Sequence, residues 1–539
     1  MISSISTSGS RRSDARPPGT RALSLERMGG SVIPLTRVAA QAVPATRSRP
    51  VTSNWKSADS PSPSPGITAK TRATAAATPK PVRAIVTPKL TTTAIRPRAD
   101  LVKALTIAID TGRRLSPPAV EAAVAEARQT DDPSFTNWRA AGLWGGYAGL
   151  AVLAGSLDAI EPECGWDSIG FEHLRRAVRS MEAEQSPAVG MAGLAGLATS
   201  ASLLSRHGSR YDRLLTRLDS AIVERVEQMS QAVLRSRPHG VPVGLFDVIA
   251  GLTGAGRYLL GRTESMPCRR ALDTLLGALV YLSEADADAV PHWHTTFLHA
   301  TDNLRKFYPD GHVNLGMAHG IPGPLALLSL SASQGVEVTG QHDAIVRIAD
   351  LIVKAQCSDE WGVGFPVAAS IRPVCRRATR EDLQNSRADA NAAAPARAAW
   401  CYGPPGGARA LWLAGVASGR SEYRDLALAA MTAVFKRPIP NRRIDAPTLC
   451  HGVAGLLQIT LRFARDGAGE IFSTAARQLT AQLLDAHEPD SRFGYCDLKP
   501  SGQRTDNPGL LEGAAGVALV LLATATPDEP AWDRILMLS

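Results

Sequence analysis

Two kinds of segment alternate along most of this chain. In segments such as "YDRLLTRLDSAIVERVEQMSQAVL" (residues 211–234), apolar residues recur at spacings of three and four, which predicts helices with one apolar face. In segments such as "GAAGVALVLLATA" (residues 513–525), nearly every residue is small or aliphatic, which is typical of a helix buried on all sides. No convincing alternation of apolar and polar residues indicates a strand. The pattern therefore predicts an all-α fold.

Each apolar segment opens with the same signature, two glycines separated by two residues. The chain has seven copies, whose first glycines are Gly146, Gly193, Gly251, Gly320, Gly403, Gly452 and Gly513. Successive copies lie 47 to 83 residues apart, which leaves room for two helices and their connections. Glycine permits sharp turns and close approach of neighbouring backbones, as crowded helix starts require. Seven pairs of one apolar and one amphipathic helix predict a closed (α/α)7 toroid with the apolar set inside.

Composition divides the chain into two regions. Residues 1–100 are rich in Pro, Ser and Arg and carry 16 Lys and Arg against 4 Asp and Glu, whereas residues 101–539 carry 43 against 46. Low-complexity sequence of this kind is typical of disorder. We therefore predict a disordered basic extension over residues 1–100 and a toroid domain over 101–539. Because the formal charge of +9 belongs to the extension, we do not expect the folded part to bind nucleic acid.

The spacing of the cysteines and the hydropathy of the chain indicate the compartment in which the protein resides. The seven cysteines are spread over more than 300 residues, without the close spacing of a small disulfide-stabilised domain. The first residues lack the apolar stretch of a secretory signal. Their Arg- and Ser-rich composition also fits an organelle transit peptide, but the low-complexity region is longer than such a peptide requires. No apolar run reaches the roughly 18 residues of a membrane span. These patterns predict a cytoplasmic protein.

The loops that lead into the inner helices, here called the entry loops, are expected to converge at one end of the toroid. Ligand sites favour such places, where rigid elements present their loops together. Four entry loops carry chemically capable side chains, which are Asp247, His319, Arg397, Cys401, Tyr402, Cys450 and His451. The other three carry mainly small residues and Glu512, and we interpret them as structural.

Cys401, Cys450 and His451 match the ligands of a catalytic zinc, which takes three protein ligands and keeps a fourth position open. Adjacent residues point about 100° apart on a helix, so Cys450 and His451 are expected in the turn before the helix, where both can face one metal. The two cysteines occupy equivalent places in two repeats. This favours a ligand role over that of a buried small apolar residue.

The remaining polar residues are less specific. His319 lies in the same register two repeats from the ligands, which favours general acid or base work. Asp247 precedes its glycine pair by four residues, and both a functional role and a local capping role stay open. A second cluster lies outside the glycine register and contains no cysteine, and we interpret it as a polar connection; it comprises His292, His294 and His299.

Four motifs resemble one known family. "NLGMAHGIPG" (314–323), "AWCYGPPG" (399–406), "LCHGVAGL" (449–456) and "LLEGAAGVAL" (510–519), in this order, closely resemble the LanC family of lanthipeptide cyclases, the lanthionine synthetase C-like proteins. The resemblance covers residues 101–539, and WCYG together with CHG is its specific part. It implies a seven-fold α/α toroid and one zinc per chain, bound by Cys401, Cys450 and His451.

The resemblance also implies an activity. A cysteine thiol of a dehydrated precursor peptide displaces the zinc-bound water, becomes a thiolate and adds to dehydroalanine or dehydrobutyrine, forming a lanthionine or methyllanthionine ring. His319 matches the proton donor or acceptor, and Asp247, Arg397 and Tyr402 match other active-site positions. Residues 1–100 have no counterpart in the cyclase domain and no dehydratase or kinase pattern. A stand-alone cyclase with a separate dehydratase is implied, and association with a membrane exporter through such a complex stays open.

Three other functions are compatible with parts of this sequence pattern. A LanC-like enzyme that adds glutathione to dehydroamino acids would use the same zinc and toroid, and the sequence hardly separates it from a cyclase. A non-catalytic zinc toroid that binds peptides or glutathione is disfavoured because the chain has His319, Asp247, Arg397 and Tyr402. A zinc prenyltransferase shares thiol activation on an α/α barrel, but WCYG with CHG is not its pattern.

Overall fold

The computed structural model describes residues 98–371 and 395–539, apart from short gaps at 131–134, 136, 185–186, 207, 237–239, 287–289, 297–298, 301 and 500–501. The expected disordered extension therefore lies almost entirely outside the described residues. Helix α2 (Arg98–Arg114) begins three positions before the domain boundary expected at residue 101.

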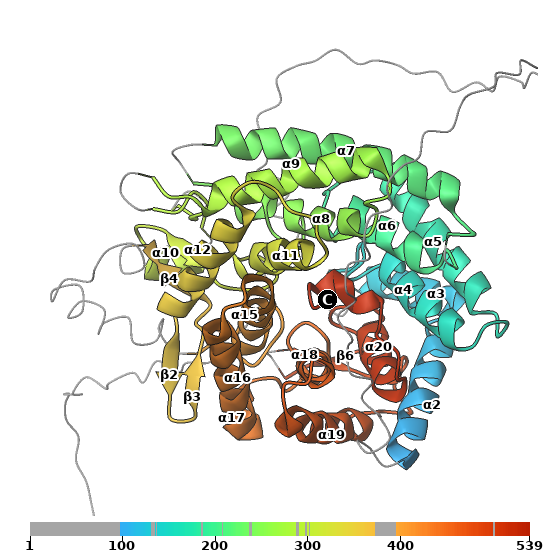
Figure 1. Cartoon of the computed structure of the whole chain (residues 1–539). Helices are drawn as coiled ribbons and strands as arrows, with labels where there is room; N and C mark the ends of the chain where they lie inside the picture. Colours follow the sequence, from blue (N-terminus) through green and yellow to red (C-terminus); the bar gives the residue numbers. More distant parts are fainter. Residues whose placement is uncertain are drawn as a thin grey trace, which may run out of the picture.

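In the described part of the chain, seven apolar helices form a closed inner ring (Figure 1). They are α4 (Tyr147–Ile160), α6 (Leu194–Leu203), α8 (Leu252–Leu260), α11 (Pro322–Ser333), α15 (Pro404–Ser418), α18 (Val453–Arg465) and α20 (Ala514–Ala525). Each packs against the next, and α20 packs against α4 to close the ring. All but the last residue of α20 are buried, as its uniformly apolar sequence predicted.

Seven amphipathic helices among the described residues surround this ring. They are α2, α5 (Trp166–Glu182), α7 (Asp212–Arg235), α9 (Met266–Ser283), α12 (Gln341–Lys354), α16 (Ser421–Lys436) and α19 (Glu470–Asp485). Among the inner helices, each amphipathic helix packs most extensively on its pair partner, and the partner of α2 is α20, so the first described helix completes the last pair. In α7 the buried residues recur at helical spacing, with Leu215, Leu218 and Ile222 facing inward. The predicted all-α toroid of seven helix pairs is confirmed.

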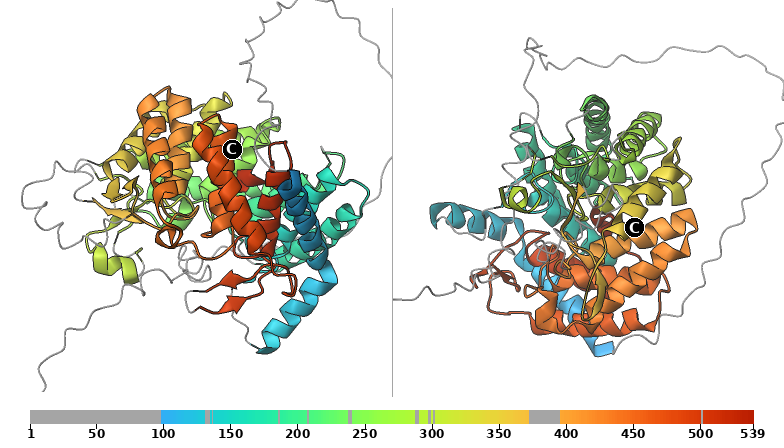
Figure 2. Two further views of the ribbon diagram at one scale, coloured as in Figure 1. Left: turned by 90° about the horizontal axis from the view of Figure 1, so that it is seen from below. Right: turned by 90° about the vertical axis from the view of Figure 1, so that its left-hand side faces the viewer.

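Short elements connect the helix pairs. They include α3 (Pro117–Thr130), α10 (Asp302–Phe307), α17 (Ile439–Arg442) and three antiparallel two-stranded sheets: β1 (His312–Asn314) with β4 (Ala368–Ser370), β2 (Cys357–Asp359) with β3 (Gly362–Gly364), and β5 (Asp497–Leu498) with β6 (Arg504–Thr505). The sequence did not predict these strands, because two or three residues are too few for alternation to be recognised. The left view of Figure 2 shows α3, α10 and the β5–β6 hairpin projecting from one end of the ring.

The last described residues occupy the middle of the ring, where Figure 1 marks the chain end. The short 3₁₀ helix η6 (Trp532–Leu536) precedes them. Arg462 of α18 forms an ion pair with Asp533 at 2.5 Å, and both side chains are buried. Arg409 of α15 donates a hydrogen bond to the carbonyl oxygen of Leu538 at 2.8 Å. Because each buried charge has a partner, this polar centre is compatible with a close-packed core.

The glycine pairs relieve two kinds of crowding at the helix starts. A Cβ atom on the first glycine of any pair would collide with backbone atoms of its own entry loop. At Gly403 the backbone also has φ of 129°, which side-chain-bearing residues rarely adopt. The second glycine lies against the neighbouring repeat, as Gly406 does against Met317 and Gly455 against Trp400. The sharp turns and close approach expected from the sequence are both present.

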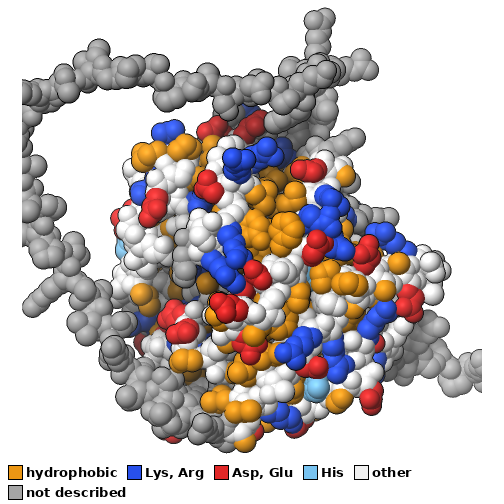
Figure 3. Space-filling model, turned by 90° about the vertical axis from the view of Figure 1, so that its right-hand side faces the viewer, with side chains coloured by type: hydrophobic (Ala, Val, Ile, Leu, Met, Phe, Trp, Pro, Cys, Tyr) orange, Lys and Arg blue, Asp and Glu red, His pale blue; other side chains and the backbone are white. Residues whose placement is uncertain are grey.

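The described surface and cysteines can be compared with the sequence. Acidic and basic side chains are interspersed on the face shown in Figure 3, without a field of one sign. The six described cysteines are free thiols, and Cys375 lies outside the described residues. Within the described part, no helix combines the length and the hydropathy needed to cross a membrane.

Candidate metal and acid–base site

Backbone hydrogen bonds join the entry loops edge to edge. Within the described loops, a ladder of six such bonds links, in order around the ring, Trp144, Leu511, Cys450, Cys401, Ala318, Val248 and Met191. For example, the amide nitrogen of Cys450 donates to the carbonyl oxygen of Leu511 at 2.8 Å, and that of Cys401 donates to Cys450 at 3.3 Å. All but Val248 lie two residues before the first glycine of their repeat. Equivalent positions of neighbouring repeats are therefore held side by side.

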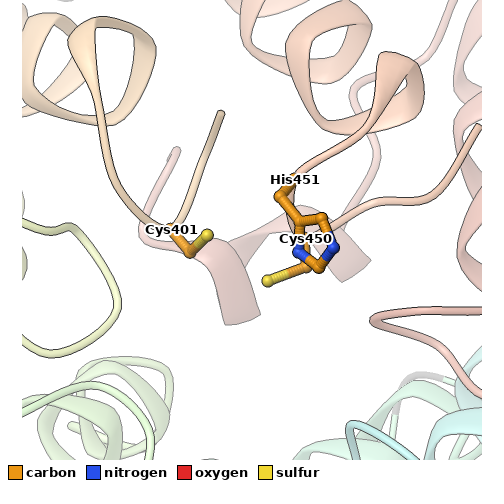
Figure 4. Close-up of side chains that lie close together, drawn as sticks. All are labelled: Cys401, Cys450 and His451. Atoms are coloured by element: carbon orange, nitrogen blue, oxygen red, sulfur yellow. The ribbon is translucent and has the colours of Figure 1, made fainter. Parts of the chain in front are cut away.

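Cys401, Cys450 and His451, here called the ligand set, meet at this ladder. Their sulfur atoms and an imidazole nitrogen lie within 4.8 Å of one another. Figure 4 shows the three side chains turned toward a common space from two entry loops. Helix α18 begins only at Val453, after Gly452, so Cys450 and His451 lie in the turn and not on the helix. That is why two adjacent side chains can approach the same point.

The ionisation of the ligand set suits a soft divalent cation. The pKa of Cys401 lies well below its ordinary value, because the hydrogen bond from Cys450 and the nearby His451 and Arg397 outweigh burial. The pKa of Cys450 lies well above its ordinary value, because it hydrogen-bonds to Cys401 and is buried. Two cysteine sulfurs and an imidazole nitrogen thus converge, and this donor set fits zinc. Among the described residues, no other group of three or more His, Cys, Asp or Glu side chains is close enough to share a metal.

The second histidine cluster does not converge in this way. The Nδ1 atoms of His292 and His294 lie 2.9 Å and 2.8 Å from the carbonyl oxygens of Tyr281 and Pro291. These backbone contacts orient the rings locally. They agree with the interpretation of this segment as a polar connection.

His319 and Asp247 form a hydrogen-bonded pair on two neighbouring entry loops. Nδ1 of His319 lies 2.6 Å from Oδ2 of Asp247. The other carboxylate oxygen, Oδ1, accepts hydrogen bonds from the backbone nitrogens of Ala250 and Gly251 at 2.7 and 2.9 Å. Asp247 therefore caps its own loop and also contacts a candidate catalytic residue. The sequence had left these two roles as alternatives.

The Asp247 carboxylate also sets the charge of His319. Burial alone would lower the pKa of the imidazole, but the hydrogen bond with Asp247 and its negative charge outweigh burial and raise the pKa above 6.5. Asp247 occupies Nδ1, so Nε2 is the nitrogen left to meet a substrate. A histidine held in one orientation, whose pKa is raised by a neighbouring carboxylate, is suited to donate a proton.

Tyr402 and Arg397 belong to the loop of Cys401. The rings of Tyr402 and His319 lie 6.4 Å apart between centroids. The Tyr402 hydroxyl accepts a hydrogen bond from Nδ2 of Asn314 at 3.1 Å, and burial raises the pKa of the phenol despite that bond. Arg397 lies close enough for its charge to lower the pKa of Cys401. Every site residue named from the sequence thus belongs to one neighbourhood at the entry loops.

Comparisons with known proteins identify the family. A model of lanthionine synthetase C-like proteins matches residues 137–537. The chain belongs to this family. A LanC relative, the nisin biosynthesis protein NisC of Lactococcus lactis subsp. lactis, is 24% identical over 334 residues, which are 61% of this chain and 72% of NisC. The structure of this chain also resembles the solved structure of a nisin cyclase, with a TM-score of 0.61 and 19% sequence identity. The match covers 78% of this chain and 97% of the nisin cyclase chain. The LanC toroid is therefore the fold of this chain.

Two residues of this LanC chain join the neighbourhood although the sequence did not single them out. Asn314 contacts Tyr402, as described above. Glu512, interpreted from the sequence as structural, stands directly before Gly513, the place that His319 holds before its own glycine. Its carboxylate accepts a hydrogen bond from Asn137 at 3.3 Å and lies 3.7 Å from the Lys499 ammonium.

The charge of Glu512 also affects the pKa of His451, a member of the ligand set. Burial lowers the pKa of His451, but Cys401 and, to a smaller extent, the charge of Glu512 raise it to a net value above 6.5. The sequence signal for Asn314 and Glu512 was a shared spacing, Asn-x-Gly-x-x-His-Gly at 314–320 and Asn-x-Gly-x-x-Glu-Gly at 507–513. Comparing the entry loops position by position would have found both.

Proposed function

We propose that this chain is a zinc-dependent lanthipeptide cyclase, which adds cysteine thiols of a precursor peptide to dehydroalanine or dehydrobutyrine and closes lanthionine or methyllanthionine rings. The observation that carries the proposal is the convergence of a Cys, Cys, His ligand set with the His319–Asp247 pair at one end of a LanC toroid. Family membership supports it, as does the likeness to proteins named for nisin biosynthesis and cyclisation.

The ligand set would hold the metal. Three protein ligands leave one position for the substrate. Zinc bound there would keep a peptide thiol in its nucleophilic thiolate form at neutral pH. The lowered pKa of Cys401 means that one ligand already favours the ionised form that metal binding requires.

His319 supplies the proton that completes the addition. When the thiolate sulfur bonds to the β-carbon, the double bond between the α- and β-carbons breaks and its electron pair moves toward the amide oxygen as an enolate. The α-carbon must then take a proton. Protonated His319 offers Nε2–H for this step, because Asp247 holds Nδ1 at 2.6 Å and stabilises the imidazolium.

The proposed reaction must follow a dehydration step. Dehydroamino acids must be formed before a thiol can add to them, so a separate dehydratase is required. A cytoplasmic location and association with an exporter through a biosynthetic complex stay predictions from the sequence.

A purified preparation should close rings in a peptide that carries one dehydroalanine and one cysteine. Ring closure leaves the peptide mass unchanged, so the free thiol is alkylated afterwards and counted by mass spectrometry. We expect chain-dependent protection from alkylation. A parallel reaction with glutathione separates the activities, since a glutathione adduct with the peptide thiol still free would indicate glutathione addition instead. A peptide that stays open and unmodified in both reactions would contradict the proposal.

Asp247→Asn is expected to shift the alkaline limb of the pH–rate profile to lower pH, by about one unit or more. The carboxylate holds the pKa of His319 above 6.5, and without it burial dominates and lowers that pKa. Protonated His319 is the active form, so the rate falls as pH rises through its pKa, and the variant reaches this point sooner. Single-turnover ring closure, measured from about pH 5.5 to 9 across the titration range of histidine, tests the shift. An alkaline limb that stays in place, with zinc content unchanged, would remove Asp247 from this role.

A further inference from the structure

Asn314, at the end of β1, has both ends of its side-chain amide hydrogen-bonded. Oδ1 accepts a hydrogen bond from the backbone nitrogen of Gly316 at 2.9 Å, and Nδ2 donates to the hydroxyl oxygen of Tyr402 at 3.1 Å. A backbone N–H can only donate, so the contact with Gly316 identifies which end of the amide is the oxygen. The Tyr402 oxygen is therefore an acceptor toward Asn314. Its own O–H is left to donate in another direction.

The same turn also holds the ring of Tyr402. A Cβ atom added to Gly316 would lie 2.5 Å from Cε1 of Tyr402, so the ring packs directly on the glycine backbone. The ring also lies near His319, at 6.4 Å between ring centroids, and it directly follows Cys401 in the chain. Asn314 and Gly316 thus hold the phenol beside the proposed proton donor, His319.

We propose that Asn314 is a positioning residue, which directs the Tyr402 O–H toward the amide oxygen of the dehydroamino acid that is being attacked. This inference rests on the proposed ring-forming function. Tyr402 then donates a hydrogen bond to the oxygen on which negative charge develops and gives up no proton, as a preorganised oxyanion donor does. The proton lost by the substrate thiol is balanced by the one that His319 gives to the α-carbon. The two side chains therefore serve different atoms of one substrate.

The chain contains the same turn without a tyrosine. Oδ1 of Asn507 accepts a hydrogen bond from the backbone nitrogen of Gly509 at 2.7 Å, and Asn507 and Asn314 are each 7% exposed. Gly509 packs against Gly145, which holds in its repeat the place that Tyr402 holds before Gly403. Asn507→Asp therefore makes the same chemical change in the same kind of turn, with no phenol beside it.

Asn314→Asp tests the direction of the Tyr402 hydrogen. The variant keeps the oxygen that accepts from Gly316, but it replaces the donor with a carboxylate oxygen, which takes the Tyr402 O–H away from the substrate. We expect kcat for ring closure to fall about 10²-fold, the usual cost of one lost oxyanion donor, with KM and zinc content little changed. Tyr402→Phe should lose a similar factor. The double variant should lose no more than either single variant, since both act on one hydrogen bond. Asn507→Asp should keep the wild-type kcat.

Other results would contradict the inference or the proposed function. Equal kcat values for Asn314→Asp and Asn507→Asp, or losses that multiply in the double variant, would show that Asn314 does not act through Tyr402. A wild-type kcat for Tyr402→Phe would refute the inference even if Asn314→Asp did not fold. Wild-type chain that leaves the peptide thiol open would instead refute the proposed function, and the inference with it.

Discussion

Cys450→Ala is expected to remove bound zinc and to abolish ring formation. The variant takes one of two sulfur donors from a set whose ligand atoms lie within 4.8 Å of one another, and two protein ligands do not complete a catalytic zinc site. Metal polarisation contributes several kcal/mol to such reactions, so we expect the rate to fall by about 10³-fold or more. Metal analysis of the purified variant, together with the alkylation assay, measures both effects.

The control for this variant is another cysteine. Cys164 is exposed and free and is not part of the ligand set, so Cys164→Ala should retain one zinc per chain and the wild-type rate. Cys450 itself is buried, but Cys450→Ala removes only the sulfur atom from the side chain, and the fold should survive this small loss of volume. A wild-type chain without zinc, or a Cys450→Ala chain that keeps both metal and rate, would refute the site.

His319→Ala is expected to keep zinc and to lose ring closure. The imidazole is the proposed proton donor to the α-carbon, and loss of a positioned acid costs about 10²- to 10⁴-fold in rate. The metal should stay because none of its three proposed ligands changes. The entry loop of Asp247 should also persist, because its other carboxylate oxygen still accepts hydrogen bonds from Ala250 and Gly251.

The comparison for His319→Ala is a histidine outside the entry loops. His294 contacts only a backbone carbonyl among the contacts described above, so His294→Ala should leave the rate unchanged. A His319→Ala chain that closes rings at the wild-type rate would remove the imidazole from the mechanism. Loss of zinc in the same variant would show that His319 supports the ligand set and not the proton transfer.

The fold could be predicted from the sequence because the same GxxG signature recurs in each helix pair. One GxxG pair carries little information, but seven pairs at the starts of apolar segments predicted seven inner helices and a closed ring. The short strands were missed because two or three residues are too few to show alternation. For β1 and β4 the partner is also distant in the sequence, as when His312 pairs with Ser370, and no local pattern records such a partner.

The sequence by itself also predicted that Cys401, Cys450 and His451 would converge, because they stand at fixed distances from their glycines and the repeat brings those positions together. It did not determine how the polar side chains share their hydrogen bonds. Only the tertiary structure decided that Asp247 both caps its loop and holds His319, and that Asn314 meets Tyr402 across 88 residues. The physical reason is that a helical period fixes which face a residue occupies, whereas hydrogen-bond direction depends on partners that the ring closure of the toroid brings within about 3 Å.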